Sequence, residues 1–265
     1  IAYAVERLVS QAAAEMNIDA AELRRRNFIP PEAFPYKTAT GSTYEIADLP
    51  GVLEKALKLS DWKGYPKRRA QTEKRGKLRG IGIATVIENT GAGNAPKDEV
   101  EIEIGKDGKV AVHTMSKTQG HGHETTFGTI VADALGVPLK QVRIIQGAPE
   151  KQHKLQGNHT GGSRSTVGAG SVCHLAALKA IDEGKAVAAL QMGVEPSQVN
   201  YAKGVFTSKE SKKSVKLGGL AKDKPFAVIA GAASGSTYPN GCHIVEVEID
   251  PATGTTEIAS YCAVD

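Results

Sequence analysis

Short segments in which apolar and polar residues alternate are the feature that most limits the fold of this chain. A period of two residues is typical of a half-buried strand, whereas the apolar face of a helix repeats after about 3.6 residues. The dipeptide Asp107-Gly108 separates two of these segments and favours a hairpin turn. A second hairpin is expected near the end of the chain, with its turn at residues 251–254. The predicted strands are residues 80–87, 99–104, 109–114, 142–145, 243–250 and 255–264.

Other segments have apolar residues at helical spacing. Asp19 and Glu22 are spaced to form a capping box at the start of a short helix that Asn27 closes. Pro50 suits the first turn of the next helix, and Gly136 suits the end of a later one. The predicted helices are residues 1–16, 19–27, 49–59, 125–135 and 165–191. Helices and hairpin-connected strands in this mixed order predict α+β layers rather than a doubly wound parallel sheet.

Two regions are expected on either side of residue 78. Residues 1–78 form a helical lead-in, and residues 79–265 form the α+β region. One continuous domain over residues 1–265 is the alternative. The Lys/Arg-rich stretch 63–79 is predicted to be a solvated linker, because a run of charge usually lies on solvated surface. The chain starts within a helical pattern and stops within a strand pattern, which is typical of a fragment of a larger protein.

Composition excludes several classes of protein. The net charge of +4 suits an anionic ligand, but the basic residues do not form the stripe with interleaved aromatics that nucleic-acid binding requires. No apolar run approaches the ~20 residues of a membrane-spanning helix. Cys173, Cys242 and Cys262 lack the spacing of a zinc site or a disulfide framework. A reducing compartment, the cytoplasm, is therefore expected.

Two glycine-rich segments, residues 117–125 and 161–166, have the features of anion-binding loops. Each precedes a predicted helix, whose unpaired first-turn N–H groups and positive dipole end favour negative charge. Glycines also allow the backbone to approach a ligand closely. Arg164 adds a planar fork of donors that suits phosphate. Because the two loops lie about forty residues apart, joined by one helix and one strand, they favour a shared binding site.

Three motifs show a resemblance to a known family. They are Gln-Gly-His-Gly-His-Glu-Thr-Thr-Phe at 119–127, Gly-Ser-Arg-Ser-Thr at 162–166 and Leu-Arg-Arg-Arg-Asn-Phe-Ile at 23–29. Over essentially its whole length, the chain resembles the molybdopterin-binding region of the molybdenum hydroxylases. That family includes xanthine dehydrogenase, aldehyde oxidase and the large subunit of aerobic carbon monoxide dehydrogenase. The Ser-Arg-Ser-Thr form is most similar to the carbon monoxide dehydrogenase branch.

The resemblance implies an oxidoreductase. Members of the family bind molybdenum through molybdopterin, here expected as the cytosine dinucleotide. They oxidise small molecules such as aldehydes, N-heterocycles or carbon monoxide with oxygen taken from water. Electrons pass to FAD and 2Fe-2S clusters, so the expected partners are iron–sulfur and flavin subunits or domains, together with the remainder of the large subunit. The cofactor supplies the difficult chemistry, and the protein supplies orientation and electrostatics.

The resemblance also implies roles for particular residues. Those expected near the pterin and the oxo ligands of the metal are Gln119, Gly120, His121 and Gly122. Those expected to hold the phosphates and the pterin edges are Ser163, Arg164, Ser165 and Thr166. Glu88 and Asn89 belong to a loop, residues 88–93, that is expected to approach the substrate.

Two departures from the family pattern bear on activity. His121 stands where the family usually has glutamine, and an imidazole lacks the paired donor and acceptor of an amide. The catalytic glutamate of the family belongs to a segment beyond Asp265, so no catalytic residue is expected in this chain and the chain alone is expected to be inactive. No metal ligand is predicted either, since the pair His121 and His123 has no third ligand at supporting spacing. His123 and Glu124 are expected instead to cap the helix that follows.

Two other functions remain open on the sequence alone. A non-catalytic relative of the family could keep the fold as a binding or assembly module, and His121 is the best support for it. An unrelated phosphate- or nucleotide-binding protein would depend only on the two glycine-rich loops. The cofactor content of the complete protein distinguishes the three.

Overall fold

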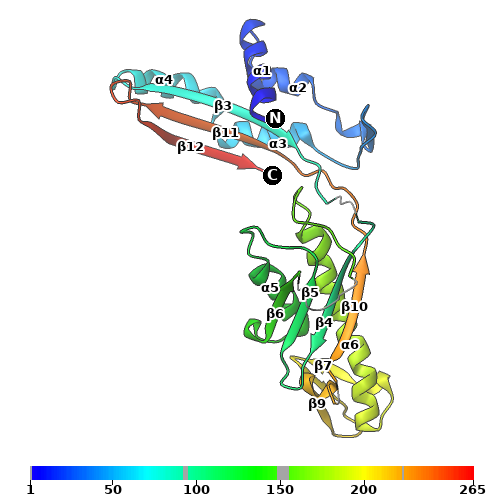
Figure 1. Ribbon diagram of the computed structural model, residues 1–265. Helices are drawn as coiled ribbons and strands as arrows, with labels where there is room; N and C mark the ends of the chain where they lie inside the picture. Colours follow the sequence, from blue (N-terminus) through cyan, green and yellow to red (C-terminus); the bar gives the residue numbers. More distant parts are fainter. Residues whose placement is uncertain (1, 92–94, 148–154, 223) are drawn as a thin grey trace. The chain divides into compact units, whose positions relative to one another are not determined.

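The computed structural model describes residues 2–91, 95–147, 155–222 and 224–265 (Figure 1). The chain forms two compact units. The first unit comprises residues 1–89 and 237–265, and the second comprises residues 90–236. The boundary expected after residue 78 falls inside the first unit, because β3 (Leu78–Ile87) pairs along its whole length with β11 (Asn240–Ile249).

The first unit is built on an antiparallel sheet of order β12-β11-β3. Helix α3 contacts β11 and β12, and helices α1, α2 and α4 contact β3. The core between them contains Leu53, Ala56, Ile83 and Ile244. The remaining elements of this unit are α1 (Ala2–Glu15), α2 (Ala20–Arg26), η1 (Pro31–Ala33), β1 (Tyr36–Lys37), β2 (Thr43–Tyr44), α3 (Leu49–Leu59), η2 (Trp62–Gly64), α4 (Tyr65–Glu73) and β12 (Thr256–Val264).

The start of α2 differs in part from the predicted capping box. Asp19 accepts hydrogen bonds from the N–H groups of Ala21 and Glu22, at 2.9 and 3.0 Å, as an N-cap should. The prediction that the Glu22 side chain completes the capping box is wrong, because this side chain accepts hydrogen bonds from Arg25 and Arg26 instead. The nearby arginines therefore outcompete the backbone for this carboxylate.

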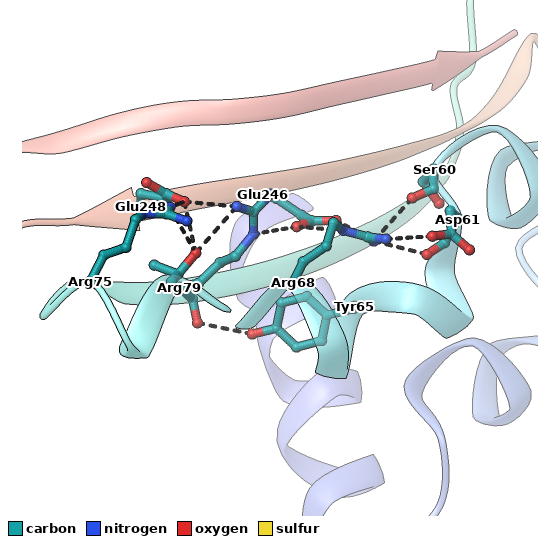
Figure 2. A network of polar contacts seen from close by, with 9 residues as sticks. Ser60, Asp61, Tyr65, Arg68, Arg75, Arg79, Glu246 and Glu248 are labelled. Carbon is teal, nitrogen blue, oxygen red and sulfur yellow. Dashed lines mark hydrogen bonds and ion pairs between the residues drawn. The ribbon is translucent and has the colours of Figure 1, made fainter. Parts of the chain in front are cut away.

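The prediction of a solvated linker over residues 63–79 is wrong. This stretch contains α4 and the start of β3, and its arginines bind two glutamates of β11 (Figure 2). Glu246 is 2% exposed and accepts from Arg68 and from Arg79, each at 2.6 Å. Burial alone would raise the pKa of Glu246, but the hydrogen bonds from these two arginines outweigh it and lower the pKa. The basic residues thus attach α4 to the sheet.

Glu248 extends the same network by two positions along β11. It accepts from Thr72 at 2.8 Å, from Arg75 at 2.5 Å and from Arg79 at 2.8 Å. The hydrogen bond from Thr72, then that from Arg75, lowers the pKa of Glu248. Arg79 bridges the two glutamates (Figure 2).

The second unit is a four-stranded mixed sheet of order β10-β4-β5-β6 with two long helices against it (Figure 1). Strands β5 and β6 are parallel, and α5 crosses between them. Alternate residues of β4 and β5, such as Val100, Ile102 and Val112, are fully buried with residues of α5 and α6. These elements are β4 (Asp98–Ile104), β5 (Val110–Thr114), α5 (His123–Leu135), η3 (Leu139–Gln141), β6 (Val142–Gln146), α6 (Ser171–Met192) and β10 (Phe226–Ala232).

The polar stretch after α6 also has regular structure that the sequence did not indicate. A small antiparallel sheet of order β7-β8-β9 lies there, and Phe206 at its centre is fully buried against the main core. Its elements are η5 (Pro196–Gln198), β7 (Asn200–Ala202), β8 (Val205–Thr207), β9 (Ser214–Lys216) and η6 (Leu217–Leu220). The predicted α+β class is confirmed. Among the described helices, none combines the length and the apolar character that crossing a membrane requires.

Candidate functional site

The first glycine-rich loop connects β5 to α5. Gly120 and Gly122 have φ of 93° and 69°, in the left-handed region that glycine tolerates best. The Thr118 hydroxyl accepts from Gly122 N at 3.1 Å and fixes the turn. No side chain caps α5, so the prediction that His123 and Glu124 cap it is wrong. Glu124 accepts from Gln146 Nε2 at 2.6 Å instead.

The second glycine-rich loop leads into the long helix. Gly162 and Ser163 have φ of 61° and 52°. The predicted α-helix over residues 165–191 begins with a π-helical turn, η4 (Thr166–Gly170), before α6. Gly170 N donates to Ser165 O at 2.9 Å, the wider spacing of a π turn. At Gly168 a Cβ atom would lie 2.5 Å from Asp98 Oδ2, so this close approach requires glycine.

Hydrogen bonds connect the two loops. The hydroxyls of Ser116 and Thr160 lie 3.2 Å apart, and Ser165 Oγ lies 3.3 Å from Thr160 Oγ1. Thr160 also donates to the carbonyl of Lys117. Ser116 and Thr160 are both buried, so these bonds are shielded from water. Neither residue was predicted, because a lone Ser or Thr in a loop has no sequence signal.

The two loops line one pocket of about 540 Å³. Both helical starts border it, which places two positive dipole ends at one cavity. Among the described residues of its lining, none is acidic. The lining residues are His121, His123, Thr126, Phe127, Thr160, Gly161, Gly162, Ser163, Arg164, Ser165 and Thr166. The pocket is therefore suited to a negatively charged ligand.

Arg164 is a buried residue of the pocket lining and has an internal partner. Its side chain is 2% exposed, and Nη2 lies 2.6 Å from Asp98 Oδ2. Asp98 also accepts from Asn158 N at 2.9 Å. The pair joins the start of β4 to the second loop. The sequence does not single out Asp98, because an isolated aspartate before a strand is an ordinary feature.

The other predicted site residues divide into two groups. Gln119, Gly120 and Gly122 belong to the first loop but are not among the lining residues. Glu88 and Asn89 follow β3 in the first unit, where Glu88 N donates to Pro239 O at 3.0 Å. Residues 92 and 93 of that loop lie outside the described part of the chain.

His123 was predicted only as a helix cap, yet it is a buried residue of the pocket wall. It is 3% exposed and stacks on Phe127, with ring centroids 4.5 Å apart. Its Nδ1 has no hydrogen-bond partner within the described residues. An unsatisfied buried nitrogen, open space beside Gly120 and Gly162, and a lining without carboxylates fit a phosphate-bearing cofactor such as a pterin nucleotide.

Comparison with known proteins identifies the family of the chain. Residues 55–265 match the molybdopterin cofactor-binding domain. The carbon monoxide dehydrogenase large chains of Hydrogenophaga pseudoflava and Afipia carboxidovorans are 31% and 32% identical, each over 99% of this chain and 36% of the relative. The nicotine 6-hydroxylase large subunit of Paenarthrobacter nicotinovorans is 26% identical over 98% of this chain and 34% of the relative.

Solved structures of molybdenum hydroxylases have the same fold as this chain. A Cu,Mo-CO dehydrogenase in the carbon monoxide reduced state superposes with a TM-score of 0.76 at 29% identity, and quinoline 2-oxidoreductase from Pseudomonas putida 86 with 0.75 at 26%. Each match covers 99% of this chain and 36% of the solved chain. The chain thus spans about a third of the length of these relatives. With its sequence and fold matched over nearly all of its residues, the chain belongs to the molybdopterin cofactor-binding domain family of the molybdenum hydroxylases.

Proposed function

We propose that this chain is the molybdopterin-binding part of the large subunit of a molybdenum hydroxylase. The observation that supports it most directly is that both glycine-rich loops line one pocket, at two helical starts. When bound, the cofactor would supply oxidation of a small molecule with oxygen from water. We propose the cytosine dinucleotide form, because the Ser-Arg-Ser-Thr motif at 163–166 resembles that of bacterial carbon monoxide dehydrogenase.

The residues of this chain would bind and orient the cofactor. The left-handed glycines Gly120, Gly122 and Gly162 would let it approach the backbone, since no described atom lies within 4 Å of a Cβ built at these positions. Gln119 and His121 would lie near the pterin. The first-loop turn and the buried Thr160 hydroxyl would keep the pocket in shape before the cofactor arrives, which lowers the cost of binding.

The second loop would hold the phosphates. Ser163, Ser165 and Thr166 present hydroxyl groups at the start of η4, where N–H groups also point out of the helix. Arg164 would act on the phosphates at longer range, because its charge is balanced by Asp98. Glu88 and Asn89 would lie near the substrate.

The activity belongs to the complete protein. We propose that its substrate is an aldehyde, an N-heterocycle or a carbon monoxide-like small molecule, and that it works in the cytoplasm. Its partners would be iron–sulfur and flavin subunits or domains with 2Fe-2S clusters and FAD, together with the remainder of the large subunit.

Metal and cofactor analysis of the complete protein, produced together with its partner subunits, tests this function. We expect about one molybdenum per chain and a pterin nucleotide that releases cytidine monophosphate on hydrolysis. An intact protein without molybdenum would contradict the proposal and favour an assembly module. An ordinary nucleotide in place of the pterin would contradict it in favour of an unrelated nucleotide-binding protein.

A further inference from the structure

The three-stranded sheet of the first unit has one face that the helices of this unit do not cover. The helices pack on the opposite face, whose Ile83, Cys242 and Ile244 belong to the core. Cross-strand pairing places alternate residues of β3, 78–86, and of β11, 241–249, on the open face, together with their β12 partners. Within these three strands, which the structure describes throughout, the open face contains no Asp, Glu, Lys or Arg.

Apolar side chains on this open face are exposed. Ile258 is 66% exposed, Tyr261 59% and Leu78 53%. An antiparallel sheet with one solvated face normally has polar residues on that face, whereas here both faces are apolar. A contiguous exposed apolar patch marks a surface that another part of a protein contacts.

The helical side of the same unit has the opposite character. Its exposed arginines form surface ion pairs, such as Arg26 with Glu22 and Arg69 with Glu73, each at 2.8 Å. Such charges suit a surface that stays in water. A face without charges is typical of a permanent contact, because obligate interfaces are the more hydrophobic ones.

Tyr261 is held ready for such a contact. Its hydroxyl lies 2.9 Å from His243 Nδ1, and the two rings meet edge to face with centroids 5.8 Å apart. A fixed aromatic ring loses little conformational entropy on binding, and tyrosine is frequent among the residues that dominate interfaces. Val245 lies between Tyr261 and Gly82 in the sheet, and a Cβ at Gly82 would meet no atom within 4 Å. Glycine within a strand is frequent where another backbone approaches closely.

The length of the relatives indicates what contacts this face. The matched part is 36% of each carbon monoxide dehydrogenase large chain, so about two thirds of such a subunit lies outside it. A permanent apolar contact forms most readily within one polypeptide, because no translational freedom is lost.

We propose that the open face around Ile258 and Tyr261 is the docking surface for the part of the large subunit that this chain does not include. That part would pack on the sheet through an uncharged, apolar face of its own. The inference rests on the proposed function only in that the chain is part of a larger subunit, and it does not depend on the cofactor.

Photo-cross-linking in the complete protein, produced with its partner subunits, tests the proposal. The photoreactive residue p-benzoylphenylalanine in place of Tyr261 keeps an aromatic ring at this position. After irradiation, we expect mass spectrometry to identify a cross-linked peptide of the same large subunit outside these 265 residues. The same residue in place of Arg69, which is 57% exposed on the helical side, is the control and should give little of that product. A cross-link from position 261 to residues 90–236, to a partner subunit or to a second copy of the large subunit overturns the proposal.

Cysteine labelling gives a second measurement that does not depend on the photoreactive residue. Ile258→Cys should react with a maleimide at least about tenfold more slowly than Glu257→Cys in the complete large subunit, because a covered thiol reacts only when the contact opens. Glu257 is the matched control, since it is the adjacent residue on the other face of β12 and is 68% exposed. Equal rates, or protection that appears only when the partner subunits are added, overturn the docking surface. Molybdenum content measured on the same samples tests the proposed function separately.

Discussion

The two units each contain a buried carboxylate paired with arginine, but the number of partners differs. In the second unit Asp98 binds a single arginine, Arg164, at 2.6 Å. In the first unit Glu246 binds two, Arg68 and Arg79, each at 2.6 Å. Glu246 therefore keeps a counter-charge when one of its arginines is lost, whereas Asp98 does not.

The difference follows from what each carboxylate connects. Glu246 joins α4 and β3 to β11, elements far apart in the sequence, and its arginines are partly open to water, at 25% and 12% exposed. Asp98 pairs with Arg164 of the pocket lining, and both side chains are nearly sealed from solvent. An unpaired charge on Asp98 costs far more free energy than one on Glu246, because water cannot replace the lost partner of Asp98. The binding loop should therefore be the more fragile of the two.

The largest effect is expected from Arg164→Ala. It leaves Asp98 buried without its counter-ion and should destabilise the second unit by about 3–5 kcal/mol. Hydrogen exchange of the β4 and α6 amides measures this unit by itself. Arg143→Ala is the control, since Arg143 is exposed on β6, and it should change stability by no more than about 0.5 kcal/mol. Similar exchange in the two variants would show that the pair does not hold the loop.

A smaller effect is expected from Glu246→Gln. The amide keeps the shape but weakens two charge-assisted hydrogen bonds, so the first unit should lose about 2 kcal/mol. Trp62 is the single tryptophan and lies in this unit, so its fluorescence during urea unfolding reports the loss. Glu257→Gln, at an exposed carboxylate 4.0 Å from Lys77, is the matched control. A shift as large in the control would refute the buried network as the cause.

The fold was largely readable from local patterns. Period-two segments located β3, β4, β5 and the β11–β12 hairpin, and Pro50 and Gly136 marked helix ends correctly. Strand β10 was missed because its sequence, Phe-Ala-Val-Ile-Ala-Gly-Ala, is rich in small residues with weak strand preference. Its register with β4 is set by tertiary pairing, which no local pattern contains.

Of the site, the sequence predicted the backbone loops but not the partners of the side chains. The glycine-rich loops predicted that two helical starts would meet, and they line one pocket. The partners of the charged side chains could not be predicted, because Asp98 lies 66 residues from Arg164 and Glu246 lies 178 residues from Arg68. Because these partners lie so far apart in the sequence, local patterns revealed neither the ion pair of Arg164 nor the contacts that hold α4 against the sheet.

Acid should lower the stability of the first unit, which contains Glu246 and Glu248. The pKa of Glu246 and that of Glu248 are lowered in the folded protein, so their contribution to stability is present above the unfolded pKa of about 4.3 and is lost as pH falls through the folded values. Unfolding followed by Trp62 should change little between pH 7 and 5 and weaken below about pH 4. In Glu246→Gln the slope should be shallower, by at most about 1.4 kcal/mol per pH unit. Identical slopes in the two proteins would show that Glu246 does not titrate with unfolding.

The smallest effect is expected from Gly184→Ala. This substitution tests whether packing in the second unit can be disturbed while the binding loops stay unaffected. Gly184 lies on α6 against the β7–β9 sheet, and a Cβ there would meet Phe206 Cζ at 2.7 Å and Leu220 Cδ1 at 3.0 Å. Both neighbours are buried, so Gly184→Ala adds overpacking of about 1–3 kcal/mol, offset by about 1 kcal/mol of helix propensity.

The net loss expected for Gly184→Ala is therefore about 1 kcal/mol, measured by exchange of the α6 amides. Asp182→Ala, exposed on the same helix, is the control and should change stability by no more than about 0.5 kcal/mol. Gly184 lies roughly 20 Å along α6 from its first residue at a rise of about 1.5 Å per residue, so the molybdenum content of the complete protein should match that of the parent. A lower molybdenum content would mean that strain passes along α6 to the pocket, and the loop held by Asp98 and Arg164 would then depend on the far end of the helix.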